Sequence, residues 1–542
     1  MSDDAWDEPE PIGAPNVPPD PPPPPPVSPD GDDPPARRAA GFALNDIGNG
    51  QRFTLYFGPD AVWVPRVGWF RWTGQVWRKD PDMIQIRGLA QQVSARIEQE
   101  VRFLQLSPAK ADLVAQRDAL LARLAVLNGL DKDAVTAGIR AERAEIDDRL
   151  GRITEAVKGL SEQAGQRLSF AKTSGNTARI DNMISEAGIG LARPVEAMDA
   201  AALEINTLSG VLRFSVWRDP SSGASAVANV ALVAHDRAQM NTKIMPVSYD
   251  PAATAPLFDG FLQRIMPSVE NRLFLQRWFG LSMTALTGEQ KLCFFYGDGA
   301  NGKSVLVDLM ARLLGDYAAT AKIESLTGSN RRAGGDATPD LVPLIGARFV
   351  RASEPDQGVK WQEGLIKELT GGEEILIRAL HSDFVAVRPQ FKLTLSGNNK
   401  PDIRGTDDGI WRRVLVVPFD VQIPAAERIP KNELDALLFA EGPGVLNWLI
   451  EGLLSYLEGG LREPVAILAA TTELREENDP YGTFLEEACV ITGDARDSIS
   501  AAELVYAFHY WMASKAEGQF KDRTVAIALK SHSRRWRSRN TV

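Results

Sequence analysis

The stretch KLCFFYGDGANGKSVLVDLMARLL, residues 291–314, decides the fold expected for the middle of the chain. After Lys291 its opening run is apolar, which is typical of a strand buried on both faces of a parallel sheet. Gly297 and Gly302 bracket a short loop that ends in Lys303 and Ser304, and a helical pattern follows. A strand, a glycine-rich turn and a helix in this order form a backbone cradle for phosphate groups.

The side chains of the loop indicate which ligand the cradle takes. Backbone N–H groups of such a turn point at phosphate oxygens, the Lys303 ammonium can neutralise β- and γ-phosphates, and the Ser304 hydroxyl can ligate Mg²⁺. We therefore predict ATP and Mg²⁺ as cofactors. The expected ATP-binding residues are Gly297, Asp298, Gly299, Ala300, Asn301, Gly302, Lys303, Ser304 and Val305.

Two later strands are predicted to end in polar side chains that suit nucleotide hydrolysis. ARFVRASEPDQG (347–358) predicts a strand that ends at Glu354, which we expect to hold Mg²⁺ and act as catalytic base. FKLTLSGNN (391–399) predicts a strand that ends at Asn398, which could bind the γ-phosphate or orient the attacking water. A surface glutamate and a turn-forming asparagine are the alternative interpretations.

Two arginines precede the next predicted strand, in GTDDGIWRRVLVVPF (405–419). An arginine that reaches a neighbouring subunit's γ-phosphate would stabilise the charge of the transition state. We predict Arg413 for this role, with Arg412 as the alternative. Such a residue requires an oligomer.

Length and composition limit the number of domains and the kinds of location that we expect. The 542 residues allow roughly three domains. No run of about 18 apolar residues is present, and the acidic start MSDDAWDEPEPIGAP is no secretory signal, so we expect neither a membrane partner nor export. Cys293 and Cys489 form no metal-ligand pattern, which fits a reducing cytoplasm.

The net charge of −11 does not exclude nucleic acid, because the charge is unevenly spread. Residues 1–40 hold nine acidic and two basic side chains, whereas the last 22 residues hold seven Lys or Arg and one Asp. Residues 1–40 also contain 14 of the 35 prolines, which predicts a solvated, disordered tail or a docking peptide.

Two modules are predicted between this tail and the loop. Residues 41–80 combine short β-prone runs with four tryptophans, which indicates a small β-rich module with a tryptophan core; stacking on single-stranded bases is the alternative. Apolar residues at heptad spacing predict a helical hairpin at about 106–165, packed within the protomer or against a neighbour. These residues are Leu113, Leu120, Leu124, Leu127, Ile139, Ile146, Leu150, Ile153, Val157 and Leu160.

The flanks of the loop region have mixed patterns. ALEINTLSGVLRF (202–214) and TKIMPVSYDP (242–251) are predicted strands, and residues 258–284 are predicted helices with a Pro-Ser break. After about 475 the pattern predicts helices, with Ser500 as a cap, and the chain ends in a basic tail with Trp536. A winged-helix DNA-binding module and a helical lid are both compatible with this end.

Lys303, Glu354, Asn398 and Arg413 fall in one segment of 111 residues. With GDGANGKS, ASEPDQG, KELTGGEEILIRAL, FKLTLSGNNKP and RGTDDGIWRR, this segment resembles superfamily 3 helicases, and most closely the phage/plasmid primase family. That family's C-terminal half is similar to poxvirus primase-helicases. The resemblance extends over roughly residues 43–83 and 165–480.

The resemblance implies an AAA+ motor that forms a hexameric ring with ATP between subunits and single-stranded DNA in its channel. It also implies a β-hairpin within residues 365–392 that grips DNA. Lys367, Arg378 and His381 are the candidate DNA-binding residues there. A solvated hairpin is the alternative.

We therefore expect an α/β fold with an AAA+ P-loop core of the superfamily 3 type. The predicted domains are a tail (1–40), a helicase-preceding mixed α/β domain with the helical insertion (41–270), the motor (271–425) and a helical or winged-helix-like region (426–542). We expect no room for a primase domain, so that a separate primase is a candidate partner. The expected function is an ATP-dependent DNA helicase in phage or plasmid replication, located in the bacterial host cytoplasm; an origin-binding or loading ATPase without processive unwinding is the alternative.

Overall fold

A computed structural model of the chain describes residues 34–217, 226–328, 338–353, 360–378, 384–403, 408–490, 492, 494, 496–514 and 521–539. The predicted site residues Glu354 and His381 lie outside these ranges, as does most of the proline-rich tail. The chain divides into two compact units. The first comprises residues up to 73 together with 77–195, and the second comprises residues 74–76 and 196–542.

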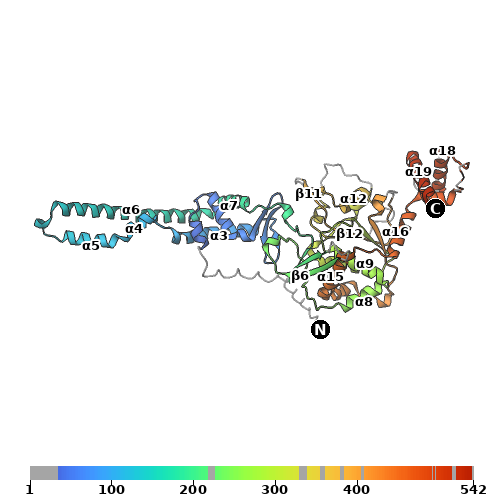
Figure 1. Cartoon of the computed structure of the whole chain (residues 1–542), viewed down its shortest axis with the longest axis horizontal. Coiled ribbons are helices and arrows are strands. Elements are labelled where there is room, and N and C mark those ends of the chain that lie inside the picture. The colour runs from blue at the N-terminus through green and yellow to red at the C-terminus, as the bar shows by residue number, and fades with distance from the viewer. Residues whose placement is uncertain are drawn as a thin grey trace, which may run out of the picture. The chain divides into compact units, whose positions relative to one another are not determined.

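The first unit combines a small sheet with helices (Figure 1). Its three antiparallel strands lie in the order β1-β2-β3, and Trp69 and Trp77 are almost fully buried, which confirms the predicted module with a tryptophan core. The elements are α1 (Pro35–Ala40), α2 (Asp46–Phe57), β1 (Ala61–Val64), β2 (Gly68–Trp72), β3 (Trp77–Lys79), α3 (Ile84–Glu100) and α7 (Thr177–Gly190).

Two expectations for this unit were wrong. The β-prone run RFTLYF lies in α2, because the Asn45 side chain caps the helix by accepting from the Gly48 N–H and because Phe53 is buried in the core. The tail predicted for residues 1–40 overlaps α1, whose Ala39 is buried. Tertiary packing thus overrides both local patterns.

A buried ion cluster joins the helices of this unit. Glu100 accepts hydrogen bonds from Arg52 Nε at 2.8 Å and Nη2 at 3.0 Å, and from Arg167. Arg52 also donates to the Ala43 carbonyl at 2.8 Å, and Arg167 donates to the Ala40 carbonyl at 2.9 Å. Charge and backbone partners together offset the cost of burying these ions.

The predicted helical hairpin is an arm formed by α4 (Pro108–Ala115), α5 (Arg117–Asn128) and α6 (Ala137–Ser174). Both α4 and α5 pack along α6, and the last two lie side by side in Figure 1. Leu127, Ile146 and Ile153, three of the heptad positions, are buried in this contact. The arm therefore buries part of its apolar seam within the protomer, whereas Val157 stays 48% exposed.

The second unit is built on a five-stranded sheet in the order β13-β7-β12-β9-β8, and all neighbouring strands are parallel. Each predicted apolar run around the loop is one of these strands. Their bounds are β7 (Leu292–Tyr296), β8 (Ala318–Thr320), β9 (Phe349–Ala352), β12 (Lys392–Gly397) and β13 (Val414–Pro418). The expected α/β class is thus confirmed.

Smaller sheets accompany it. The antiparallel sheet β4-β5-β6 is formed by β4 (Glu204–Thr207), β5 (Gly210–Trp217) and β6 (Val227–Val233), and the hairpin by β10 (Ile375–Ile377) and β11 (Val385–Val387). The strand predicted at 242–251 is absent: Met245 makes one isolated bridge to Thr207. Pro246, which has no N–H to donate, interrupts the pairing there.

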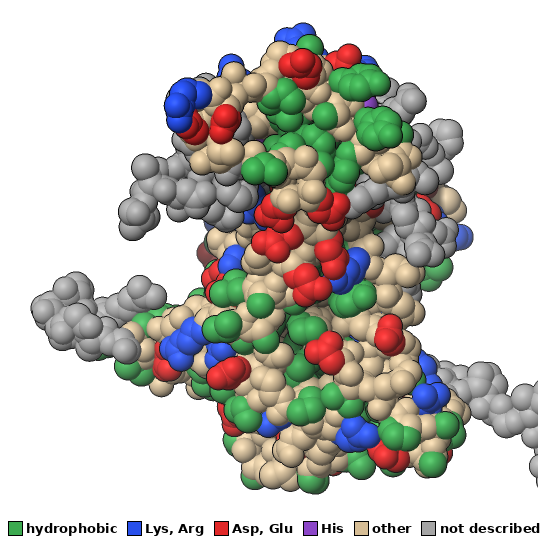
Figure 2. All heavy atoms as spheres, turned by 90° about the vertical axis from the view of Figure 1, so that its right-hand side faces the viewer, with side chains coloured by type: hydrophobic (Ala, Val, Ile, Leu, Met, Phe, Trp, Pro, Cys, Tyr) green, Lys and Arg blue, Asp and Glu red, His purple; other side chains and the backbone are tan. Residues whose placement is uncertain are grey.

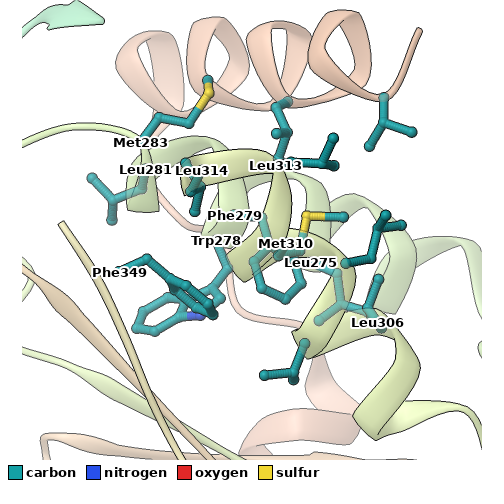
Figure 3. Packing of buried hydrophobic residues seen from close by; sticks show 14 of the residues in the cluster. Leu275, Trp278, Phe279, Leu281, Met283, Leu306, Met310, Leu313, Leu314 and Phe349 are labelled. Carbon is teal, nitrogen blue, oxygen red and sulfur yellow. The ribbon is translucent and has the colours of Figure 1, made fainter. Parts of the chain in front are cut away.

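Helices cover both faces of the five-stranded sheet, and side chains alternate between two cores. Cys293 and Phe295 face one apolar cluster, whereas Leu292 and Phe294 face the other. Figure 3 shows Trp278 and Phe279 of α9 beside Phe349 of β9. The helices of this part are α8 (Pro256–Ile265), α9 (Val269–Ser282), α10 (Lys303–Leu314), α11 (Ile323–Leu326), α12 (Glu363–Gly371), α13 (Asp408–Trp411), α14 (Lys431–Ala440), α15 (Gly442–Gly459) and α16 (Val465–Glu477).

The C-terminal segment forms α17 (Pro480–Ala488), α18 (Ala501–Ser514) and α19 (Asp522–Arg539). Ser500 is confirmed as a cap: its hydroxyl accepts from the Glu503 N–H at 3.2 Å, and Glu503 accepts from the Ser500 N–H at 3.1 Å. After residue 480 the described residues contain helices and no strand. The face on this side carries hydrophobic side chains above a group of Asp and Glu side chains (Figure 2).

In the described ranges, no single helix has the length and apolar character needed to cross a membrane. The bent pair α14 and α15 meets the criteria only by length and composition taken together, and half of α15, including Val445, Leu449 and Leu453, is buried in the core.

We predict that Gly452→Ala destabilises the second unit, because α9 and α15 approach too closely for a side chain. A Cβ at Gly452 would lie 2.0 Å from the Gln276 carbonyl oxygen. The free energy of unfolding should fall by about 2 to 3 kcal/mol in chemical denaturation. The matched control is Gly364→Ala on α12, where a Cβ meets nothing within 4 Å. An equal loss in both variants would contradict this account.

Candidate nucleotide-binding site

The glycine-rich loop lies where three parallel strands end together. Tyr296, the last residue of β7, is paired with Gly397 of β12 on one side and with Pro418 of β13 on the other. Gly297, Asn398 and Phe419 therefore follow three adjacent strand ends. Ligands of open parallel sheets bind at this carboxyl edge.

Two glycines give the loop its shape. Gly297 has φ of 154°, and a Cβ there would lie 2.3 Å from the Phe419 carbonyl oxygen. Gly302 has φ of 80°, and a Cβ there would lie 2.4 Å from Ile265 Cγ2 of α8. The backbone therefore approaches both β13 and α8 more closely than any other residue type allows.

Asn301 and Lys303 hold the loop from inside. The Asn301 amide donates to the Phe419 carbonyl at 3.2 Å, and its oxygen accepts from the Lys303 N–H at 3.3 Å. The Lys303 ammonium is buried and donates to the Gly297 carbonyl at 2.8 Å and to Asn398 Oδ1. Lys303 and Asn398, which were predicted from separate motifs, are thus in direct contact.

A cavity of about 730 Å³ opens in front of the loop. Its size falls in the range of small-molecule sites. The loop forms one side, and α8 and residues 423–434 form the rest. The lining residues are Pro256, Leu257, Gly260, Phe261, Arg264, Gly299, Ala300, Asn301, Gly302, Lys303, Ser304, Val305, Asn398, Ile423, Glu427, Arg428, Ile429, Lys431 and Leu434. Gly297 and Asp298 of the predicted set are not among them.

Sequence reasoning missed the cavity wall that faces the loop. Residues 256–264 were interpreted only as helix, and no role was inferred for residues 423–434. The structure, and not the sequence, shows that Leu257 of α8 stays 40% exposed at the cavity. The spacing of glycine, lysine and serine identifies the glycine-rich loop in a sequence. The residues of the cavity wall have no comparable spacing by which they could be recognised.

One charged residue of this wall connects the cavity to the helix behind the loop. Lys431 contacts Asp308 of α10 at 2.7 Å and Asp435 at 2.6 Å. Partial burial disfavours its charge, but the hydrogen bonds to these two carboxylates outweigh that cost and raise the pKa of Lys431 above its ordinary value. Asp308 also pairs with Arg351 of β9.

The two arginines before β13 lie far from the loop of their own chain. Val414 is paired with Leu292, at the opposite end of β7 from the loop. Arg413 is buried and donates from Nε to Thr370 Oγ1 at 3.1 Å and from Nη1 to the Gly409 carbonyl at 3.0 Å. Arg412 has an exposed side chain.

The predicted DNA-binding residues lie outside the cavity. Lys367 is partly buried on α12. Arg378 follows β10; its N–H donates to Thr338 Oγ1 at 2.9 Å, and its guanidinium lies 4.8 Å from the centre of the Phe384 ring. The antiparallel hairpin expected from the resemblance is present as β10 and β11. His381 belongs to the part of this hairpin that the structure does not describe.

Two protein families match separate parts of the chain. The family described as "D5 N terminal like" matches residues 50–267, and a "Family of unknown function (DUF5906)" matches residues 295–413, which include the loop, Asn398 and both arginines. Curated viral relatives are named helicases and primases. The chain thus contains a region similar to the "D5 N terminal like" family and is similar to viral proteins named putative helicases and primases.

The curated relatives overlap with this chain over a limited part of their length. "Putative helicase L207/L206" of Acanthamoeba polyphaga mimivirus is 29% identical over 276 residues, which are 48% of this chain and 29% of the relative. "Putative helicase 022R" of Frog virus 3 is 25% identical (47% and 28%), and "Putative primase C962R" of African swine fever virus is 25% identical (46% and 28%). The matched part of the chain thus spans less than a third of each relative.

Among solved structures, the apo NrS-1 C-terminal region is 13% identical to this chain. The match covers 52% of this chain and 81% of that one, with a TM-score of 0.29.

The two arginines should differ in their effect on stability. Arg413→Ala leaves the buried Thr370 hydroxyl and Gly409 carbonyl without this donor and should lower the free energy of unfolding by about 1 to 3 kcal/mol. Arg412→Ala removes an exposed side chain and should stay within about 0.5 kcal/mol of wild type. Urea unfolding of both variants measures the difference, and the reverse order would refute the assignment of Arg413 to the core.

Proposed function

We propose that this chain is an ATP-dependent DNA helicase of the superfamily 3 type, which acts in replication as a ring with ATP between subunits. The observation that carries the proposal is the contact of buried Lys303 with Asn398 at the carboxyl edge of the five-stranded parallel sheet. A lysine in a glycine-rich loop and a polar side chain on the adjacent strand end are the parts that a nucleotide motor needs beside the γ-phosphate.

The order of the strands supports an AAA+ type of P-loop core. The strand before the loop, β7, lies between β12, which carries Asn398, and β13, which follows the arginines. The strand expected to carry the acid, β9, is next along the sheet beyond β12. Each predicted motif therefore belongs to a neighbouring strand of one sheet.

The residues of the loop fit ATP and Mg²⁺. Gly297 and Gly302 let the loop backbone adopt its turn against Phe419 and Ile265. The side chain of Ser304 at the start of α10 is exposed beside the cavity, and the helix N-terminus favours negative charge. Bound Mg²⁺ would offset phosphate charge. Ser304 and Glu354 are its expected ligands, Lys303 holds phosphate oxygens, and Asn398 orients the water or the γ-phosphate.

The position of the arginines supports a ring. The five residues of β13 span about 16 Å at the usual rise per residue, so an arginine at its start cannot reach its own loop. Any nucleotide that it contacts would therefore belong to a neighbouring subunit. Arg412, with its exposed side chain, is better placed for this than the buried Arg413. The proposed assembly is a homo-hexamer.

DNA is the proposed substrate, because curated relatives are named helicases and primases. Single-stranded DNA would pass along the β10–β11 hairpin, with Lys367, Arg378 and His381 on its backbone. A separate primase is a candidate partner, and the proposed location is the cytoplasm of a bacterial host. The second candidate function, an origin-binding or loading ATPase, predicts DNA binding without strand separation.

Lys303→Ala should lower the rate of ATP hydrolysis by at least about a hundredfold, because the phosphates lose their buried cation. The wild type should separate the strands of a forked duplex only when ATP and Mg²⁺ are present, and the variant should not. Circular dichroism controls for folding. ATP hydrolysis by the wild type without any strand separation would favour the loading ATPase.

Mixing two variant chains tests whether the arginine of one subunit acts on the nucleotide of its neighbour. Lys303→Ala and Arg412→Ala chains should each be inactive alone. An equal mixture should regain activity at about a quarter of its interfaces, where an intact loop meets an intact arginine. The same mixture made with Arg413→Ala distinguishes the two arginines. Co-assembly of the two chains without recovered hydrolysis would rule out Arg412.

A further inference from the structure

Two large aromatic side chains of α18 lie outside the core of the C-terminal helices. That core is a cluster shared by α17, α18 and α19, and it includes Phe484, Phe508 and Leu529. Tyr506 is 74% exposed and Tyr510 is 73% exposed. The two tyrosines are four residues apart and therefore lie on one face of the helix. Exposed tyrosines on one face indicate a surface that binds a partner, since this residue type is enriched in protein interfaces.

Basic side chains lie beside this face of α18. The His509 ring, next to Tyr510 in the sequence, contacts the Asp522 carboxylate at 2.9 Å, so the face adjoins the start of α19. Lys521 and Arg523 flank Asp522 in the sequence, and both are exposed. Within the part of the chain that the structure describes, neither of their side chains has an ion pair. The surface thus combines two aromatic rings with positive charge that the carboxylates of a partner can neutralise.

The two ends of the chain have opposite charge. Residues 1–33 hold nine Asp or Glu and no Lys or Arg, which gives a net charge of −9. Residues 521–542 hold seven Lys or Arg and one Asp, which gives +6. The acidic segment also contains 12 prolines and one aromatic residue, Trp6, which lies among acidic residues in DDAWDE. Proline and tryptophan pack well on tyrosine rings, so this segment complements the surface in both charge and apolar contact.

The length of the segment also suits the surface. When extended, 33 residues span about 100 Å. The 14 residues of α18 are about 21 Å long, so the segment can cover this helix and still reach the basic side chains beside it. As part of the chain itself, the segment is present at a high effective concentration, which favours it over a free partner.

We propose that the acidic, proline-rich segment 1–33 docks on the face of α18 that carries Tyr506 and Tyr510, with its carboxylates on Lys521 and Arg523. The inference goes beyond the proposed function, since no nucleotide takes part in the contact. Packing of the prolines and Trp6 on the two rings supplies affinity, and the opposite charges select the partner. The docked segment covers the tyrosines and neutralises the basic end of the chain, so other polyanions compete with it for this surface.

Zero-length carbodiimide crosslinking of the full chain tests the contact, because it joins carboxylates to lysine amines that already touch. Mass spectrometry should find residues 1–33 joined to Lys521. The double variant Tyr506→Ala and Tyr510→Ala should lower the yield of this crosslink by at least about fivefold, whereas the double variant with Phe at both positions keeps the rings and should retain it. The matched control is Trp217→Ala, which removes another exposed aromatic side chain, 62% exposed on β5, and should leave the yield within about twofold of wild type.

An excess of free peptide with the sequence of residues 1–33 should compete with the crosslink, and a peptide with Asn or Gln at its nine acidic positions should not. A mixture of isotope-labelled and unlabelled chains shows whether the segment docks on its own chain or on a second copy. Absence of the crosslink to Lys521, or an unchanged yield in the Tyr→Ala double variant, would overturn the proposal. It also fails if that variant keeps the crosslink and instead loses binding of single-stranded oligothymidylate, because the face would then bind nucleic acid. Thermal unfolding confirms that each variant is folded.

Discussion

The second unit depends on the pairing of β7 between β12 and β13. Because all three strands are parallel and in register at Tyr296, Gly397 and Pro418, their carboxyl ends meet at one edge. The loop after β7 is then held by Asn301 on the β13 side and by Lys303 on the β12 side. The loop is therefore shaped by neighbouring strands, which would reduce the reorganisation that the proposed phosphate binding requires.

The opposite edge of the same sheet has a structural task. Arg348 and Lys392, at the amino ends of β9 and β12, are buried. Arg348 donates to the carbonyls of Glu204 at 2.6 Å and Met283 at 3.1 Å, and Lys392 donates to those of Thr284 and Leu286. Burial, with a contribution from Arg348, lowers the pKa of Lys392 well below its ordinary value. The cost of burying these charges is offset because the backbone carbonyls that follow α9 gain hydrogen-bond donors.

Sequence predicted β7, β9, β12, β13 and the loop of the second unit, because continuous apolar runs and glycine spacing reflect local backbone requirements, but the strand predicted at 242–251 is absent. The α2 helix was missed, since Phe53 is placed by packing against distant residues and not by β propensity. Sequence placed Asn398 at a strand end with a role at the γ-phosphate, but it did not predict the direct contact with Lys303. The burial of Arg413 was not predicted, because two adjacent arginines look identical in sequence. The hydrogen bond that distinguishes Arg413 from Arg412 goes to Thr370, which lies 43 residues away in the chain. Glu354 stays a prediction.

Because α8 forms one wall of the cavity, the structural unit that contains the cavity begins before the boundary between the two matched families. The "D5 N terminal like" match ends at residue 267 and therefore includes α8, whereas the other match starts at residue 295. Yet Ile265 of α8 touches Gly302, and Phe261 lines the cavity. A boundary drawn between the two families would cut through the cavity, and a fragment that begins after residue 267 would lose one wall and the contact of Ile265 with Gly302. The two families therefore contribute to one site, and residues 196–267 belong physically with the sheet that follows them.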